Sequence, residues 1–189
     1  MLLVSTPMSG QPATGRASDA SAPIEVFVVD VDGVMTDGTF WYTETGKVMK
    51  RFGPDDADAL ALVRRFMRIE FVSADHRGMP ITRRRIVDDM GYDLYEVGAL
   101  ERLDWVEQRH GLERVAYMGD GIYDAPLLRA AGYGIAPADA DPLALAAADY
   151  VTARPGGRRA VAEACLHILE RYFGVVNWYD ASRTELSGA

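Results

Sequence analysis

IEVFVVDVDG, residues 24–33, decides the fold because it joins a buried strand to a pair of carboxylates. The run 26–29 is apolar at every position, which predicts a strand covered on both faces, as in a parallel sheet. Asp30 ends the run, and Asp32 and Gly33 follow it. The stretch therefore predicts a central strand whose carboxyl end carries two acidic side chains.

The rest of the chain alternates apolar runs with amphipathic stretches. Further strands are predicted at 69–72, 94–97 and 115–118, with short outer strands at 133–135 and 150–152. Helices are predicted at 55–68, 80–90, 100–110, 125–131 and 159–172, and a β-hairpin where 39–42 and 47–52 flank a turn at 43–46. This alternation predicts an α/β domain, an open parallel sheet with helices on both faces. Ligands of such folds bind beyond the carboxyl ends of the strands.

The composition excludes several classes of protein. The 189 residues include 20 basic and 28 acidic side chains, for a formal net charge of −8, which argues against non-specific binding to nucleic acid. The one cysteine, Cys165, excludes an internal disulfide and a multi-cysteine zinc site. No apolar run approaches the ~18 residues that span a membrane, so we expect no membrane partner.

Both ends of the chain are predicted to be tails around a folded domain at 24–174. Residues 1–23 are rich in Ser, Gly, Ala and Pro, and residues 1–7 lack the basic residues and long apolar core of a secretion signal. We therefore predict a flexible N-terminal tail and a cytoplasmic protein. Residues 175–189 form the second predicted tail, which is a candidate subunit contact.

Asp30 and Asp32 have the spacing of a reactive carboxylate pair. A carboxylate at a strand end can act as a nucleophile, and a second one two residues on can act as general acid and base. Two crowded carboxylates repel each other, and a divalent cation compensates for that repulsion. A polar turn is the simpler interpretation of an isolated Asp-x-Asp, but the buried run before it and Gly33 after it favour a site.

Residues 119–124 read GDGIYD between a predicted strand and a predicted helix. A dinucleotide-binding loop of the G-x-G-x-x-G type is one interpretation, but Asp124 stands in place of the third glycine. Asp120 and Asp124 would also put negative charge beside a pyrophosphate. Mg²⁺ takes a few carboxylates and keeps waters and phosphate oxygens, so a metal site is the better interpretation.

Three motifs far apart in the chain together resemble the haloacid dehalogenase-like superfamily of phosphatases: DVDGV at 30–34, Ser73 at a strand end, and GDxxxD at 119–124. Three further stretches resemble the uncapped branch of 3-deoxy-D-manno-octulosonate 8-phosphate phosphatases: DVDGVMTDG at 30–38, KRF at 50–52, and DYVT at 149–152 with GGR at 156–158. The resemblance covers about 24–172. It implies a three-layer, Rossmann-like (HAD-like) α/β fold with a β-hairpin flap and no cap domain.

The resemblance implies a role for each matched residue. Asp30 is the expected nucleophile that becomes a phosphoaspartate, and Asp32 the expected acid and then base. Mg²⁺ is expected on Asp30, on Asp32 through its carbonyl, and on Asp120. Ser73 is expected to bind the phosphoryl group, and Asp124 to orient a basic residue or a metal-bound water. Phosphoryl transfer suits such a site because it depends on positioning and on neutralising oxygen charge.

Arg102 is the positional match for a phosphate-binding residue that is usually lysine in this branch. The only lysines here are Lys47 and Lys50. Arginine binds phosphate bidentately but differs from lysine in reach. The alternative is a solvated helix residue paired with Glu101 or Asp104.

The residues expected around the substrate differ from the pattern of this branch more strongly than Arg102 does. Ser73-Ala74-Asp75 replaces Thr-Gly-Arg, and residues 54–56, Pro-Asp-Asp, stand where a base is common, so octulosonate specificity does not follow. His76, Arg77 and Arg158 could supply the missing positive charge. The expected substrate-binding residues are Ser73, Ala74, His76, Arg77 and Arg102.

The spacing of the motifs leaves no room for a cap domain. Asp32 and Ser73 are 41 residues apart, and Ser73 and Arg102 are 29 apart, and both intervals are filled by predicted elements. The resemblance implies that uncapped relatives complete their sites as tetramers, so we expect a homotetramer. Aromatic residues at 40–42 and 175–179 are candidate contacts, and packing within one subunit is their alternative interpretation.

Three functions are compatible with these motifs. The first is a Mg²⁺-dependent phosphomonoesterase for a small phosphorylated sugar or sugar acid, acting through a phosphoaspartate. The second is a phosphatase of a specialised pathway whose substrate is a phosphorylated sugar-nucleoside acid. The third is a non-catalytic regulatory relative, against which the intact Asp30, Asp32 and Asp120 argue.

Overall fold

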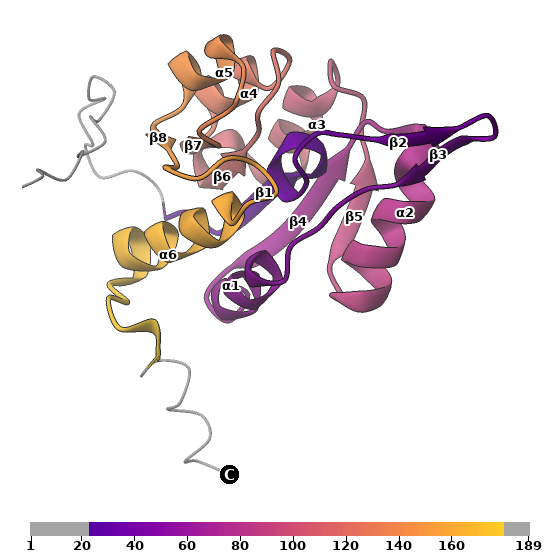
Figure 1. Ribbon diagram of the computed structural model, residues 1–189. Coiled ribbons are helices and arrows are strands. Elements are labelled where there is room, and N and C mark those ends of the chain that lie inside the picture. The colour runs from indigo at the N-terminus through magenta and orange to yellow at the C-terminus, as the bar shows by residue number, and fades with distance from the viewer. Residues whose placement is uncertain (1–22, 180–189) are drawn as a thin grey trace, which may run out of the picture.

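The computed structural model describes residues 23–179 and shows a six-stranded parallel sheet with helices on both faces (Figure 1). Strand β1 (Val26–Asp30) lies in the middle, hydrogen-bonded to β4 (Arg68–Ser73) on one side and β6 (Val115–Met118) on the other. The order across the sheet is β5-β4-β1-β6-β7-β8, and every neighbouring pair is parallel. The outer strands are β5 (Asp93–Glu96), β7 (Tyr133–Ala136) and β8 (Tyr150–Val151).

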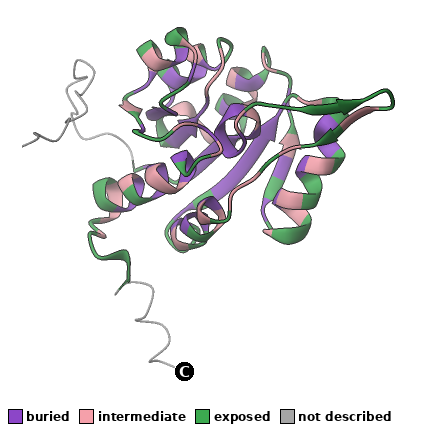
Figure 2. Cartoon of the chain, viewed as in Figure 1, coloured by how far each residue is buried: buried purple, intermediate pink, exposed green. Residues whose placement is uncertain are grey.

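The apolar run of β1 divides between two cores because successive side chains of a strand point to opposite faces. Phe27 and Val29 belong to the core under α1, α2 and α6, whereas Val26 and Val28 belong to the core under α3, α4 and α5. The purple strands in Figure 2 show this burial. The helices are α1 (Asp55–Val63), α2 (Met79–Arg83) with its π-helical continuation η3 (Arg84–Asp89), α3 (Arg102–His110), α4 (Ala125–Ala130), α5 (Pro142–Ala147) and α6 (Ala160–Phe173).

A separate β-hairpin projects from the body of the protein (Figure 1). It pairs β2 (Trp41–Thr43) with β3 (Gly46–Met49) in antiparallel fashion, and most of its residues are exposed. The hairpin occupies the interval between β1 and α1. In the other interval, between β4 and α3, lie α2, η3 and β5, so neither interval of the described chain holds a cap domain.

The predicted fold class is confirmed, and the differences are local. Helix α1 ends at Val63 instead of residue 68, because a turn through 64–67 leads directly into β4. Helix α5 was not predicted, although Asp141 and Pro142 carry the signal of a helix start: the Asp141 side chain accepts a hydrogen bond from the Leu143 amide. Two 3₁₀ turns, η2 (His76–Gly78) and η4 (Leu112–Arg114), were also missed.

Both predicted tails fall largely outside the described residues. Residues 1–22 of the first and 180–189 of the second are not described. Residues 175–179 are described, and Val175 packs against the core. Among the helices between residues 23 and 179, none combines the length and apolarity needed to cross a membrane.

Candidate active site

The sheet topology brings the predicted site residues to one edge. Asp30 is the last residue of β1 and lies beside Val72, the residue before Ser73. On the other side of β1, Val29 pairs with Met118, the last residue of β6. The loop that carries Asp120 therefore begins next to Asp30. Because the strands are parallel, their carboxyl ends meet here.

A tight, irregular turn, η1 (Val31–Met35), carries the chain away from Asp30, and Asp32 and Gly33 within it have non-helical backbone angles. Gly33 has φ +94°, a conformation that favours glycine, and a Cβ built on it would lie 2.0 Å from Asp120 Oδ2. The buried Thr36 hydroxyl closes the turn by accepting hydrogen bonds from the Gly33 and Gly38 amides, each at 3.3 Å. Gly33 therefore lets the turn pass directly against Asp120.

Three carboxylates meet at the ends of β1 and β6. One oxygen from each of Asp30, Asp120 and Asp124 lies within 4.8 Å of the other two, and Asp30 and Asp124 are buried. Burial raises the pKa of Asp30. The positive charge of Arg102 opposes this shift, and the negative charges of the neighbouring carboxylates add to it. Burial and the charge of Asp124 raise the pKa of Asp120 to about 7. Burial and the mutual repulsion of these acids thus both disfavour their charged forms.

Arg102, at the start of α3, is the cation of this group, which we call the carboxylate–arginine cluster (Asp30, Arg102, Asp120, Asp124). Its Nη1 lies 2.6 Å from Asp124 Oδ1 and 3.3 Å from Asp30 Oδ1. It also donates to the Tyr117 hydroxyl at 2.9 Å, and Tyr117 in turn hydrogen-bonds Asp124. Arg102 is only 4% exposed, so the alternative of a solvated helix residue is wrong.

Asp124 is fixed from both sides. Its Oδ2 accepts hydrogen bonds from the backbone amides of Asp120 at 3.2 Å and Gly121 at 2.8 Å. Its Oδ1 faces Arg102. Asp124 thus lies where it can orient Arg102, and its role as the residue that orients a basic group or a metal-bound water, which the resemblance implies, stays a prediction.

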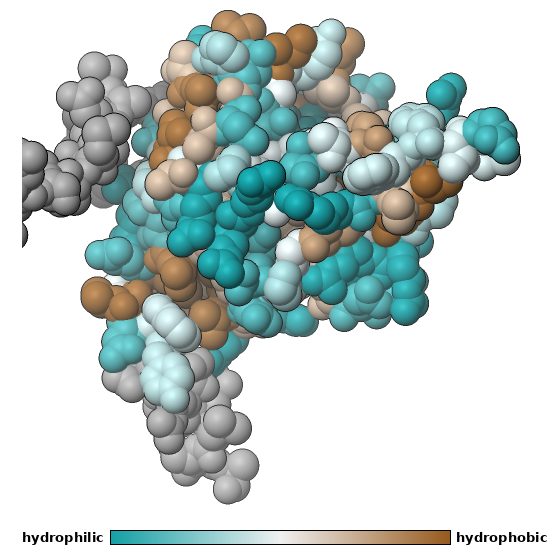
Figure 3. Space-filling view, in the orientation of Figure 1, coloured by the Kyte–Doolittle hydropathy of each residue, from teal (hydrophilic) through white to brown (hydrophobic). Residues whose placement is uncertain are grey.

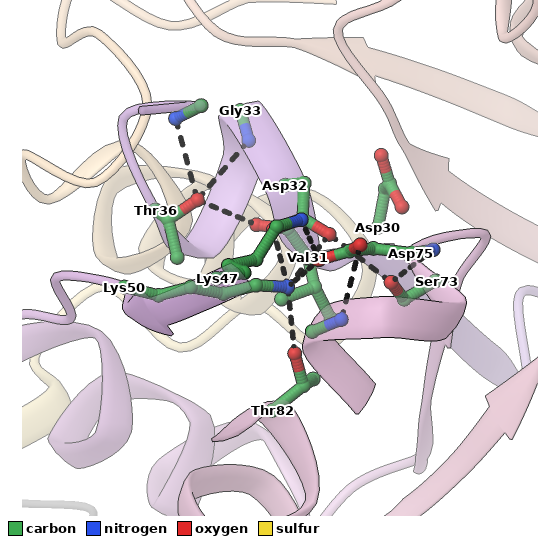
Figure 4. Close-up of polar contacts among 12 residues, drawn as sticks. Asp30, Val31, Asp32, Gly33, Thr36, Lys47, Lys50, Ser73, Asp75 and Thr82 are labelled. Atoms are coloured by element: carbon green, nitrogen blue, oxygen red, sulfur yellow. Dashed lines mark hydrogen bonds and ion pairs between the residues drawn. The ribbon is translucent and has the colours of Figure 1, made fainter. Parts of the chain in front are cut away.

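The side chain of Asp32 turns away from these carboxylates into a second group (Figure 4). Its Oδ2 accepts hydrogen bonds from Ser73 Oγ at 3.1 Å and from Lys50 Nζ at 3.0 Å. Lys50 Nζ also lies 2.8 Å from Asp75 Oδ2, and Lys47 Nζ lies 2.5 Å from the same oxygen. We call these four charged residues, Asp32, Lys47, Lys50 and Asp75, the lysine–carboxylate cluster.

Sequence reasoning missed both lysines of this cluster. Lys47 lies in the hairpin and Lys50 just after it, and only the folded chain shows that their side chains reach Asp75 and Asp32. Burial raises the pKa of Asp75, but hydrogen bonds from Lys47 and Lys50 outweigh it and hold the pKa below its usual value. The available signal was that the two lysines of an otherwise arginine-based chain lie three residues apart.

The remaining predicted substrate-binding residues lie at the rim. Ala74, His76 and Arg77 are exposed beside Ser73. His76 Nδ1 lies 2.7 Å from Glu96 Oε1 on β5, so its ring is paired with a carboxylate there. Neither His76 nor Arg77 shows a contact with the two clusters among the residues described, and their substrate-binding role stays a prediction.

Comparison with known proteins places the chain in a family. Residues 106–164 match the family model of haloacid dehalogenase-like hydrolases. The 3-deoxy-D-manno-octulosonate 8-phosphate phosphatase of Haemophilus influenzae is 34% identical over 152 residues, 78% of this chain and 83% of that protein. The Yersinia pestis enzyme of the same name is 32% identical over 169 residues, 84% of this chain and 86% of that protein.

Similar solved structures support the same family assignment. The Moraxella catarrhalis enzyme of that name, in complex with a magnesium ion, a phosphate ion and KDO, superposes with a TM-score of 0.71 at 26% identity, covering 84% of this chain and 92% of that one. A cobalt-bound Haemophilus influenzae structure gives 0.70 at 33% identity, over 82% and 93% of the two chains. The chain is a phosphatase and belongs to the haloacid dehalogenase-like hydrolases, in the branch of the 3-deoxy-D-manno-octulosonate 8-phosphate phosphatases.

Proposed function

We propose that this enzyme is a Mg²⁺-dependent phosphomonoesterase that removes phosphate from a small phosphorylated sugar or sugar acid through an Asp30 phosphoenzyme. One observation carries the proposal: at the end of the central strand, Asp30 lies beside a buried arginine and two further carboxylates. Such a site offers a nucleophile, a cation for phosphate and oxygen ligands for a metal. The names of its relatives support the substrate class.

The residues present fit Mg²⁺. Asp30 and Asp120 supply carboxylate oxygens, which hard divalent cations prefer, and a bound cation would offset both the burial and the charge of Asp124 that raise the pKa of Asp120. The side chain of Asp32 is committed to Lys50 and Ser73, so Asp32 would contribute its backbone carbonyl only. When bound, Mg²⁺ neutralises charge on the phosphoryl oxygens.

The chain's own residues account for the two chemical steps. Asp30 attacks phosphorus, forming the bond from its carboxylate oxygen as the bond to the leaving oxygen breaks, and Asp32 protonates that oxygen. Asp32 then takes a proton from the water that hydrolyses the phosphoaspartate. Arg102 binds phosphoryl oxygens, and the Ser73 hydroxyl does so once it turns its hydrogen from Asp32 Oδ2 to the phosphoryl group. Arg102 Nε supports this role, because it is buried and has no hydrogen-bond partner among the residues described.

The lysine–carboxylate cluster differs from the pocket expected for octulosonate, so a phosphorylated sugar-nucleoside acid of a specialised pathway stays a second candidate substrate. Asp75 stands where the branch is expected to carry arginine, and two lysines neutralise it. The part of the substrate beyond the phosphate therefore meets a different charge pattern. A non-catalytic regulatory role has no support from the site, whose acids are all in place.

Phosphate release from a panel of phosphosugars, phosphorylated sugar acids and nucleotides tests both candidates. We expect Mg²⁺-dependent turnover with the highest kcat/KM for a sugar or sugar-acid phosphate. A higher kcat/KM for a nucleoside-containing substrate would instead support the second candidate, a phosphorylated sugar-nucleoside acid. An enzyme that releases no phosphate from any member would contradict both.

Magnesium binding should depend on pH because protons and the metal compete for Asp120. Its pKa is raised to about 7, and the pKa of Asp30, the second carboxylate ligand, is raised as well, so the apparent affinity for Mg²⁺ should rise at least about tenfold per pH unit below pH 7. Titration calorimetry at pH 6, 7 and 8 measures this. Asp120→Asn is the control and should bind Mg²⁺ weakly and with a shallower pH dependence. An equal affinity at all three pH values would be evidence against Asp120 as a ligand.

We also propose a homotetramer in which the hairpin contacts other subunits. Trp41 and Tyr42 are each 59% exposed and Met49 54%, and a few brown, apolar atoms lie among pale and teal ones on the hairpin in Figure 3. Exposed apolar patches of this kind mark interaction surfaces.

Sedimentation velocity tests the tetramer. Trp41→Ser with Met49→Ser should shift it to smaller species, whereas Leu143→Ser, an equally exposed residue on α5, should not. A monomeric wild-type protein would refute the proposal.

A further inference from the structure

Lys50 is buried at an unusual meeting of charges. Its side chain is 0% exposed, and Nζ lies 2.7 Å from Asp32 Oδ1 and 3.0 Å from Asp32 Oδ2. It also donates to Thr82 Oγ1 at 2.8 Å, on α2. A buried ammonium has to be fully paired, since an unpaired one is costly in a dry environment. Lys50 therefore ties the segment after the hairpin to Asp32 and to α2.

Lys50 belongs to a row in which negative and positive side chains alternate, Asp32–Lys50–Asp75–Lys47 (Figure 4). Asp75 shares Lys50 with Asp32, but it is also bound by Lys47 and by the Gly78 amide at 3.1 Å. Lys47 is held in turn over the Phe40 ring, 3.3 Å from its centroid. Asp75 is thus satisfied by several groups, and Lys50 can keep both of its short contacts with Asp32.

We propose that Lys50 is a positioning residue that holds the Asp32 carboxylate in the orientation needed for proton transfer to the leaving oxygen. The proposal rests on the proposed function. The other restraint on the Asp32 side chain is the Ser73 hydroxyl, which contacts Oδ2 alone, whereas Lys50 Nζ lies within 3.0 Å of both carboxylate oxygens. Removing the ammonium would leave the Ser73 hydroxyl as the remaining contact of the Asp32 carboxylate, while Asp75 would keep Lys47 and the Gly78 amide.

This role predicts an effect that depends on the leaving group. An alkoxide is a poor leaving group and needs the proton from Asp32, whereas 4-nitrophenolate departs without one. The value of kcat/KM covers the steps up to departure of the leaving group, so later hydrolysis of the phosphoenzyme does not enter it. A residue that only stabilises the fold would lower kcat/KM for both substrates by the same factor.

The test compares kcat/KM for a sugar phosphate and for 4-nitrophenyl phosphate in the full chain with saturating Mg²⁺. Lys50→Met should lose about 100-fold on the sugar phosphate and less than about tenfold on the aryl ester, which is the range of general acid catalysis. Asp32→Asn should show the same split. Thr82→Val, which removes only the hydroxyl that anchors Lys50, should show a smaller split of the same sign and covers the case in which Lys50→Met does not fold.

Lys47→Met is the matched control, because Lys47 contacts Asp75 but makes no ion pair with Asp32 among the residues described. It should lower kcat/KM for both substrates alike. Equal losses on the two substrates in Lys50→Met and Thr82→Val, or the same split in Lys47→Met, would overturn the proposal. A wild-type enzyme that hydrolyses neither ester would instead remove the proposed function itself.

Discussion

Asp30→Asn is expected to reduce phosphate release by about 10⁴-fold or more while the protein stays folded, because it removes the attacking oxygen. The change keeps the shape of the side chain and takes away a charge that burial already disfavours, as the raised pKa of Asp30 shows. We therefore expect no loss of thermal stability. A sensitive phosphate assay and a thermal melt measure the two effects.

Asp37→Asn serves as the control for Asp30→Asn. Asp37 lies in the same motif, but it accepts hydrogen bonds from Thr39 and pairs with Arg51 at 3.2 Å, outside both clusters. Turnover of this variant should stay within about tenfold of wild type, since surface substitutions cost little. Appreciable hydrolysis by Asp30→Asn, above that of a preparation lacking the enzyme, would falsify the nucleophile assignment.

Arg102→Met is the second large effect, and it should appear in both stability and activity. The guanidinium contacts Asp30, Asp124 and Tyr117 in a buried setting, and its loss leaves three carboxylates together without their cation. Removing one partner of a buried ion pair costs about 3 kcal/mol or more. Activity should fall about 100-fold or more, because a donor to the transferring phosphoryl group is lost.

Urea unfolding of Arg102→Met with and without Mg²⁺ measures how much stability the positive charge of Arg102 contributes. Mg²⁺ should restore part of the lost stability, because a cation bound by the carboxylates replaces the missing positive charge. Arg102→Lys keeps that charge and should recover most of the stability and part of the activity. If Arg102→Met unfolds at the same urea concentration as the wild type, Arg102 does not hold the cluster together.

Much of the fold could be predicted because the chain's patterns are local. The continuous apolar run of β1 indicates a strand buried on both faces, and the alternation of strands and helices indicates a parallel sheet. Parallel strands in turn bring their carboxyl ends together, so Asp30, Ser73 and Asp120 could be placed at one edge before any coordinates. The chemical roles of these residues remain predictions.

What the sequence did not reveal depends on contacts between distant segments. Lys50 meets Asp32 and Thr82 across 18 and 32 residues, and nothing near Lys50 indicates that its segment folds back over the site. The η1 turn is similar, because its shape is set by Gly33 passing Asp120 and by Gly156, whose Cβ would lie 1.8 Å from the Gly33 carbonyl oxygen. Such close approaches are visible only after the chain has folded.

The burial of Lys47 and Lys50 has a practical consequence for watching the hairpin move. These are the only lysines of the sequence, and their side chains are 4% and 0% exposed. An acylating reagent selective for primary amines can therefore modify an ε-amino group only in molecules whose hairpin has lifted away from the sheet. The rate of that labelling, followed by mass spectrometry, reports how often the flap opens, without a foreign probe.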